Sequence, residues 1–262
     1  MLLSFSALRY WPFAIGCAYG VFAISCMLVY EKPYAIGEDG MNAQFAAARR
    51  LMVEEQLRAR GIHDERVLKA MAKVPRHLFV PDKYQNLAYE DQPLPIGFGQ
   101  TISQPYMVAI MVEALELKGN EVALEVGTGS GYQAAILSLL ARRVYSVEII
   151  PELAEEARER LKRLGYENVE VVLGNGSLGW EKGGPYEAMV IAAAAPKVPE
   201  LLIDQLKEGG RLVIPVGDLS LQSCVQVRKE GGRVCFKNLG ACSFVPLVGE
   251  EGWKKEPPMG AD

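Results

Sequence analysis

Apolar and polar positions alternate along the middle of the chain in two different rhythms. Short apolar runs of strand-like length occur at residues 122–126, 144–147, 169–173, 188–192 and 212–215. Longer amphipathic stretches with helical spacing lie between them, at residues 132–140, 151–164 and 199–206. Strands that alternate with helices are typical of a parallel sheet covered on both faces. The pattern therefore predicts an α/β fold with a doubly wound, mostly parallel sheet.

The segment before these strands is predicted to begin as helices. Helical spacing runs through residues 41–61, and a second helix begins after Asp64, a favourable N-cap, and ends at Pro75. Residues 78–99 contain many prolines and glycines and show little periodicity, which predicts an ordered loop packed over a site. A further helix is expected at residues 105–115.

The pattern after Pro215 is that of strands alone. Apolar runs at residues 224–228 and 234–236 flank Gly231 and Gly232, a pair suited to a tight hairpin turn. We therefore expect antiparallel strands at one edge of the sheet.

The first forty residues differ from the rest of the chain. Residues 10–30 contain no charged side chain and are long enough to cross a hydrocarbon core of ~30 Å as a helix. Three interpretations remain open: a membrane anchor through residues 10–30, a cleaved signal peptide, and a misplaced start with Met41 as the true first residue.

Composition narrows the classes of function. The chain has 262 residues, of which 50% are hydrophobic and 23% charged, so it can bury a substantial core. A net charge of −4 gives no reason to expect a nucleic-acid partner. The five cysteines include no C-x-x-C pair, so we expect neither a metal site nor a disulfide framework. His63 and His77 are expected to be ordinary surface or core histidines.

A glycine-rich turn follows the first strand of the alternating region. Its residues are Gly127, Thr128, Gly129, Ser130 and Gly131. In a doubly wound sheet, ligands bind at the carboxyl ends of the strands, and glycine permits a close approach of the backbone to the ligand. The G-x-G-x-G spacing differs from the G-x-G-x-x-G of dinucleotide sites and favours S-adenosyl-L-methionine over a nicotinamide cofactor. The four residues Gly127 to Ser130 are candidate cofactor-binding residues.

Three polar residues near strand ends support this interpretation. Glu125 precedes the glycines, where its carboxylate can offset a cationic sulfonium and amino group directly or through water. Glu148 closes the second strand, where a carboxylate can accept hydrogen bonds from ribose hydroxyls. Asn175 and Gly176 follow the third strand and are placed to contact adenine. The alternatives are solvated acids at strand ends and, for Asn175, the ordinary preference of tight turns.

Motifs spread over residues 41–253 match one family. They are the segments PRHLFVP (75–81), AYED (88–91), PLPIG (93–97), GQTISQP (99–105), GSLGW (176–180), AAAP (193–196), GGRLVIPVG (209–217) and FVPLVG (244–249). Together with the glycine turn they resemble the protein-L-isoaspartate O-methyltransferases, a family of class I S-adenosylmethionine-dependent enzymes. Thr101–Ser103 is the most specific part of the match.

The resemblance implies a fold, an activity and further site residues. The implied fold is a seven-stranded, Rossmann-like methyltransferase sheet, and the implied protein is a cytoplasmic monomer that acts on isoaspartyl-containing proteins and peptides. The implied reaction transfers a methyl group to the free α-carboxylate of an L-isoaspartyl residue, which begins protein repair. Ser103 matches the active-site serine whose hydroxyl holds that carboxylate. Other implied contacts are Thr101 and Ile102 with the cofactor, and Gln104, Ala193 and Ala194, beside Ser103, with the substrate.

On this basis we divide the chain into parts and keep two alternative functions. The expected parts are an apolar segment (1–40) and a methyltransferase domain (41–262), made of a helical and substrate-loop part (41–118), a cofactor-binding core (119–217), C-terminal strands (218–253) and a tail (254–262). Asn175 and Ala192 stand where the family usually has Asp and Thr, so we expect cofactor binding weaker by about 0.5 to 3 kcal/mol. The alternatives are a methyltransferase for small molecules and a carboxylate-binding module without catalysis.

Overall fold

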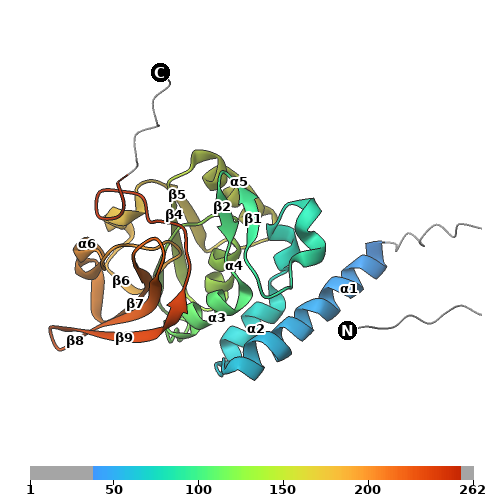
Figure 1. Cartoon of the computed structure of the whole chain (residues 1–262), viewed down its shortest axis with the longest axis horizontal. Coiled ribbons are helices and arrows are strands. Elements are labelled where there is room, and N and C mark those ends of the chain that lie inside the picture. Colours follow the sequence, from blue (N-terminus) through green and yellow to red (C-terminus); the bar gives the residue numbers. More distant parts are fainter. Residues whose placement is uncertain (1–37, 255–262) are drawn as a thin grey trace, which may run out of the picture. The chain divides into compact units, whose positions relative to one another are not determined.

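A seven-stranded sheet forms the centre of the protein, whose computed structural model describes residues 38–254 (Figure 1). The strand order is β5-β4-β3-β6-β7-β8-β9. Strands β3 to β7 pair in parallel, and β7, β8 and β9 pair antiparallel. The bounds are β3 (Val122–Val126), β4 (Arg143–Glu148), β5 (Val169–Leu173), β6 (Tyr186–Ile191), β7 (Leu206–Gly217), β8 (Gln222–Glu230) and β9 (Arg233–Cys242). The predicted doubly wound, mostly parallel sheet with antiparallel C-terminal strands is confirmed.

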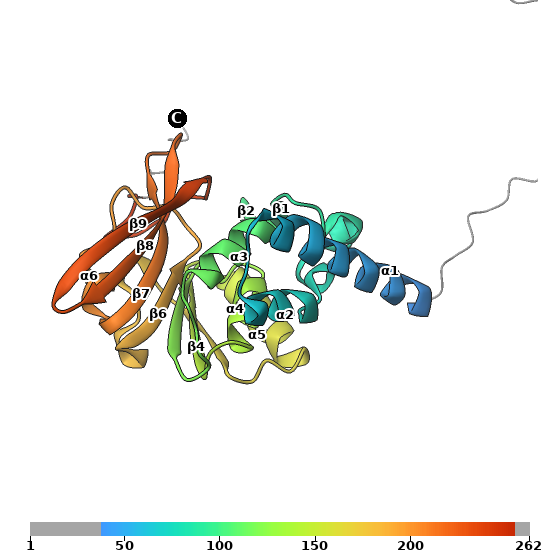
Figure 2. The same ribbon diagram turned by 90° about the horizontal axis from the view of Figure 1, so that it is seen from below.

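Helices cover both faces of this sheet and divide the core into two apolar clusters. Helix α3 (Pro105–Glu113) precedes β3, and three helices connect the following strands: α4 (Tyr132–Ser138), α5 (Pro151–Arg163) and α6 (Glu200–Asp204). Helices α3, α4 and α5 pack with Ala123 and Val144 on one face, which also meets the N-terminal helices (Figure 2). Leu202 of α6 packs with Leu124 and Val126 on the other face. Alternate residues of β3 therefore point to different clusters, as strand geometry requires.

The N-terminal helices follow the predicted pattern closely. Helix α1 (Glu38–Leu51) continues as a π-helical turn, η1 (Met52–Leu57), and a 3-10 turn, η2 (Arg58–Arg60). Gly61 then ends the helix with a positive φ of 94°. The Asp64 side chain accepts a hydrogen bond from the Arg66 backbone N–H at 2.8 Å, which caps α2 (Glu65–Lys73).

Residues 78–99 contain more regular structure than we predicted. Two 3-10 turns, η3 (Arg76–Phe79) and η4 (Asp82–Leu87), precede an antiparallel hairpin of β1 (Leu94–Gly97) and β2 (Gln100–Ile102). The prediction of an irregular loop was wrong for this hairpin, because strands this short show too little alternation to be recognised. The hairpin turns at Phe98, a non-glycine residue with a positive φ of 51° whose side chain is 52% exposed.

Two shorter departures occur at the C-terminal side of the sheet. Helix α6 ends at Asp204, and β7 begins at Leu206, where helical spacing was predicted and the strand was expected only from residue 212. A register shift between Tyr186 and Ala188 of β6 accommodates Gly209 and Gly210 in the early part of β7. Glycine lowers the strand signal of this part of the sequence, which is why the extension was missed.

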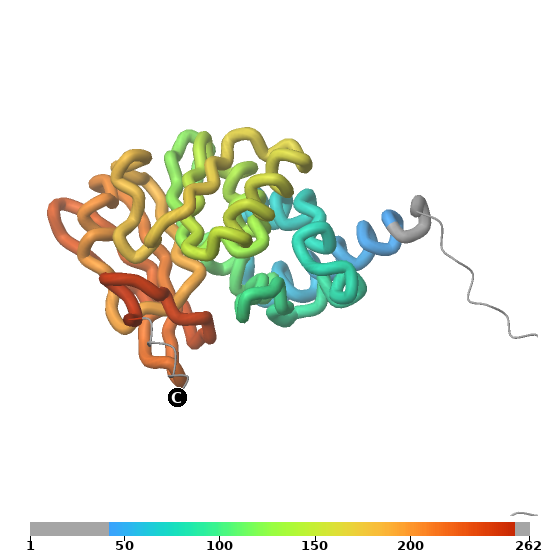
Figure 3. The backbone as a smooth tube through the Cα atoms, turned by 90° about the horizontal axis from the view of Figure 1, so that it is seen from above, coloured from blue at the N-terminus to red at the C-terminus, as the bar shows by residue number. Residues whose placement is uncertain are grey.

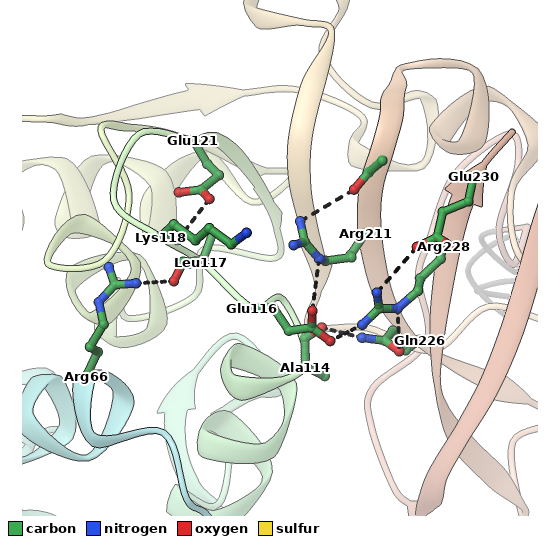
Figure 4. Close-up of polar contacts among 11 residues, drawn as sticks. Arg66, Ala114, Glu116, Leu117, Lys118, Glu121, Arg211, Gln226, Arg228 and Glu230 are labelled. Carbon is green, nitrogen blue, oxygen red and sulfur yellow. Dashed lines mark hydrogen bonds and ion pairs between the residues drawn. The ribbon is translucent and has the colours of Figure 1, made fainter.

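The predicted C-terminal hairpin is present and is tied to the base of α3. Gly231 and Gly232 both have positive φ and join β8 to β9. The Glu116 carboxylate lies between the guanidinium groups of Arg211 and Arg228, at 3.6 Å from Arg211 Nε (Figure 4). Gln226 donates a hydrogen bond to the Ala114 carbonyl. These contacts hold the antiparallel strands against the end of the helix that begins beside Ser103.

The last described segment returns across the carboxyl ends of the strands (Figure 3). Pro246 pairs with Ala194, and Val248 pairs with Trp253, both as isolated parallel bridges. This return places residues 245–248 next to the loops that follow the central strands.

No helix within residues 38–254 is long and apolar enough to cross a membrane. The predicted apolar segment, residues 10–30, lies outside the described residues.

His77 is a core histidine, as expected, and it gives the fold a pH dependence. Its Nδ1 lies 2.7 Å from the Tyr89 hydroxyl, and its ring stacks on Phe45 at 4.1 Å between centroids. Burial, with a smaller effect of Arg49, lowers the pKa of His77 from an ordinary 6.5 to about 4. The folded protein therefore binds fewer protons than the unfolded chain between these values, and stability is lost as pH falls through this window.

We predict that replacing His77 flattens this acid response. Relative to His77→Asn, the wild-type protein should lose up to about 1.4 kcal/mol of unfolding free energy per pH unit between pH 6.5 and 4. Urea unfolding at a series of pH values measures it, with the exposed residue change His63→Asn as the matched control. Parallel profiles for wild type and His77→Asn would contradict the prediction.

Candidate active site

A cavity of about 410 Å³ opens at the carboxyl ends of the central parallel strands. Its walls come from the ends of β3 and β4, the glycine turn, the loops after β5 and β6, the segment between β2 and α3, and the returning residues 245–248. This is the edge of the sheet where a doubly wound fold binds ligands.

The glycine turn forms one wall of this cavity. Gly127, Gly129 and Gly131 have φ values of 90°, 51° and 86°, a region of backbone conformation that favours glycine. A Cβ atom on Gly131 would lie 3.3 Å from Leu161 Cδ1, so α4 begins in close contact with α5. Thr128 and Ser130 also line the cavity. All the residues that we predicted in this turn are therefore at the cavity wall or shape it.

Glu148 fixes the glycine turn to the end of β4. Its Oε2 accepts from the Gly129 N–H at 2.8 Å, and its Oε1 accepts from the Ile149 and Ile150 N–H groups at 2.9 and 3.0 Å. A carboxylate oxygen has two acceptor sites, so Oε2 can take one further donor. Glu148 lines the cavity and is 5% exposed. Its position fits the predicted contact with a ligand hydroxyl.

Glu125 is the most deeply buried acid of the site. The Ser146 hydroxyl donates to Oε2 at 2.5 Å, and Ser146 Oγ lies 2.6 Å from Thr128 Oγ1. Oε1 has no hydrogen-bond partner among the described residues, although Glu125 lines the cavity. Burial raises the pKa of the Glu125 carboxyl to about 8, which Ser146 partly opposes. An unpartnered acceptor of this kind fits a cationic ligand, whose charge favours the ionised carboxylate.

The segment with the predicted active-site serine is held by a buried arginine. Thr101, Ile102 and Ser103 line the cavity. The Arg76 guanidinium donates from Nη2 to the Ser103 carbonyl at 2.8 Å and from Nε to the Ala88 carbonyl at 2.7 Å. Burial lowers the pKa of Arg76 to about 10, so it remains charged at neutral pH. Arg76 thus positions the backbone of Ser103.

Two of the four predicted substrate residues lie in the cavity wall, and two lie behind it. Ser103 and Ala193 are in the wall. Gln104 instead donates from Nε2 to the Asp91 carbonyl at 3.0 Å. The Ala194 carbonyl accepts from Leu247 N–H at 2.8 Å and from Trp253 Nε1 at 3.0 Å, which holds the returning segment.

Asn175 and Gly176 also have separate roles. Asn175 Oδ1 accepts from the Ser177 N–H at 3.1 Å and from its hydroxyl at 2.8 Å, which is the local turn role that we weighed against a ligand contact. Gly176 lines the cavity, and a Cβ there would lie 2.2 Å from Val126 Cγ1. Ala192 lines the cavity as well.

Sequence analysis missed several contributors to this site, of which three stand out. Phe98 and Gln133 line the cavity, and Arg76 supports it from behind. Arg76 was recognisable as a single charged residue in the apolar segment 74–80. Gln133 was recognisable as a polar residue among the apolar positions of the helix that follows the glycine turn.

We predict that the raised pKa of Glu125 makes the ligand-free protein less stable at high pH. The folded state holds a proton that the unfolded chain releases near pH 4.5, so stability is lost as pH rises from 4.5 to about 8. The loss, relative to Glu125→Gln, should reach up to about 1.4 kcal/mol per pH unit. Chemical unfolding between pH 5 and 8 tests this, with the exposed change Glu200→Gln as control. The same pH profile for Glu125→Gln and wild type would refute it.

Comparison with known proteins identifies the family. The model for the family described as protein-L-isoaspartate(D-aspartate) O-methyltransferase matches residues 48–252. The protein-L-isoaspartate O-methyltransferase of Methanoculleus marisnigri is 57% identical over 205 residues, covering 78% of this chain and 93% of that protein. The enzyme of the same name from Dictyoglomus thermophilum is 53% identical, covering 80% of this chain and 96% of that protein.

Solved structures agree with this result. A protein-L-isoaspartate O-methyltransferase superposes with a TM-score of 0.70 at 30% identity, covering 78% of this chain and 67% of that one. A Plasmodium falciparum protein, described as a protein-L-isoaspartate O-methyltransferase in complex with S-adenosyl-L-homocysteine, gives a TM-score of 0.67 at 28% identity and covers 76% and 98% of the two chains. From the matched motifs, the sheet and these relatives together, the chain belongs to the protein-L-isoaspartate(D-aspartate) O-methyltransferase family.

Proposed function

We propose that this protein transfers a methyl group from S-adenosyl-L-methionine to the free α-carboxylate of L-isoaspartyl residues in damaged proteins and peptides, and thereby begins their repair. The observation that carries the proposal is the position of Ser103. The family's most specific motif, Thr101–Ser103, lies in the wall of the same cavity as Glu125 and the glycine turn. The residues proposed to bind the cofactor and the acceptor therefore line one cavity.

The cofactor side of the proposal rests on the two buried acids. Glu125 offers an unpartnered carboxylate oxygen suited to a cationic group, and Glu148 keeps acceptor capacity for a ribose hydroxyl. When bound, S-adenosyl-L-methionine supplies a methyl group on a positively charged sulfur. The product of this cofactor, S-adenosyl-L-homocysteine, is bound in the Plasmodium falciparum relative.

The acceptor side requires orientation more than acid–base chemistry. A carboxylate with an ordinary pKa near ~4 is already ionised at neutral pH, so no base has to remove a proton. Holding the reacting groups in line contributes up to roughly 7 to 11 kcal/mol to lowering a barrier. Ser103 is proposed to donate a hydrogen bond to the acceptor carboxylate, while Arg76 keeps its backbone in place. Ala193, also in the wall, is a proposed substrate contact.

The environment of the protein follows from its cofactor. Because S-adenosyl-L-methionine is a cytoplasmic metabolite, we propose that residues 41–262 face the cytoplasm. This placement holds whether residues 10–30 form a real anchor or Met41 is the true first residue. The expected monomeric state remains a separate prediction.

We predict selective methylation of isoaspartyl peptide. The purified protein is incubated with methyl-labelled cofactor and two peptides that differ only in an aspartyl or isoaspartyl linkage. Only the isoaspartyl form should be labelled, because only it presents a free α-carboxylate at that residue. Equal labelling of both peptides would contradict the proposal. Peptide binding without labelling would indicate a binding module, and labelling of small molecules alone would indicate the other alternative.

We also predict that Ser103→Ala weakens the acceptor side alone. The loss of one hydrogen bond to a charged group should raise the KM for isoaspartyl peptide about tenfold or more. The affinity for S-adenosyl-L-homocysteine, measured by calorimetry, should change little. The exposed change Ser220→Ala is the matched control. An unchanged peptide KM in Ser103→Ala would remove the serine from the proposed site.

A further inference from the structure

Gln133 carries a buried amide nitrogen that has no hydrogen-bond partner among the described residues. It lies in the first turn of α4, directly after the glycine turn, and is 6% exposed. Its Nε2 atom has no hydrogen-bond partner within residues 38–254, and the residue lines the cavity. A buried amide donor without a partner destabilises a protein, so its presence calls for an explanation, and a bound ligand is one.

A second unpartnered polar atom lies on the same side of the sheet. Glu125 and Ala123 alternate with Leu124 and Val126 along β3, and Ala123 belongs to the apolar cluster that contains α3 and α4. Glu125 therefore points to the face that α4 covers, and its Oε1 is also unpartnered. The cavity thus offers an unpaired donor and an unpaired acceptor on one face.

The opposite face of the sheet contributes apolar surface to the cavity wall. Val126 and Ala193, from the cluster on the opposite face, line the cavity with apolar surface. Glu148 and Gly176, at the ends of β4 and β5, are the residues proposed for ribose and adenine. The charged amino-acid group of the ligand and the acceptor carboxylate still need polar partners, and Glu125 and Gln133 are polar wall residues on the α4 side of the sheet that can supply them.

We propose that Gln133 donates a hydrogen bond from Nε2 to a ligand carboxylate on the side of the cavity that α4 covers. The inference rests on the proposed function. A carboxylate close to Glu125 would be repelled unless a donor faced it, and Gln133 supplies a donor without adding charge. Two carboxylates meet this description: that of the homocysteine part of the cofactor and that of the isoaspartyl acceptor.

The test compares two ligands that differ in that carboxylate. Calorimetry on the full-length protein, without peptide, measures the binding of S-adenosyl-L-homocysteine and of 5′-methylthioadenosine, which lacks the amino-acid group. The variant Gln133→Met keeps the length of the side chain and removes the amide. The KM for isoaspartyl peptide is also measured for the wild-type protein and the variant at saturating S-adenosyl-L-methionine. Gln92→Met, at an exposed position, is the matched control.

Each result decides the question. A roughly tenfold or greater loss for S-adenosyl-L-homocysteine, with 5′-methylthioadenosine unchanged, supports the inference with the cofactor as the source of the carboxylate. Unchanged nucleoside binding with a peptide KM raised by about the same factor supports it with the acceptor as the source. Equal losses for both nucleosides would reveal a merely structural role and overturn it, as would no change in any measurement.

The outcome is separable from that of the proposed function. The proposed function is judged on the wild-type protein, by its selective labelling of isoaspartyl peptide. This inference is judged on the ratio of variant to wild type in binding measured without peptide. A wild-type protein that binds S-adenosyl-L-homocysteine but labels no peptide would overturn the proposed function. The inference on Gln133 would still be tested by the binding of the two nucleosides.

Discussion

The Arg76 guanidinium is fully shielded from solvent and contacts three separate parts of the chain. It donates to the carbonyls of Ala88 and Ser103 and lies over the Tyr132 ring at 4.8 Å. The loop that carries Ser103 is thereby attached to the helix that follows the glycine turn. A buried charge needs hydrogen-bond partners, and these two carbonyls are the acceptors of the guanidinium among the described residues. The position of Ser103 relative to the glycine turn depends on this group.

The two acids at the strand ends, Glu148 and Glu125, have different roles. The Glu148 carboxylate accepts hydrogen bonds from three backbone N–H groups and so holds the glycine turn in shape. Glu125 has one oxygen engaged by Ser146 and the other unpartnered. Burial without compensation raises the pKa of Glu125 to about 8, and a cationic ligand reverses that effect by favouring the charged form. One acid thus builds the site, and the other is available to a ligand.

The sequence predictions were more accurate where the apolar runs were long and uninterrupted. The strands at residues 122–126 and 169–173 and the hairpin at Gly231 and Gly232 were placed correctly, because each combines an apolar run with clear flanking residues. The β1–β2 hairpin was missed because its strands are only 4 and 3 residues long. The early part of β7 was missed because Gly209 and Gly210 interrupt the apolar run.

The sequence alone determined the sheet, the carboxyl-end location of the site and the candidates Glu125 and Glu148, because periodicity and local motifs carry that information. Ser103 became a candidate through the family resemblance of its motif. Only the tertiary structure decided which side chains meet. It turned Asn175 toward Ser177, placed Gln104 and Ala194 behind the wall, and brought Gln133 and Arg76 to the site. Hydrogen-bond partners distant in sequence and the burial of individual atoms depend on how the elements pack, and no local pattern records that packing.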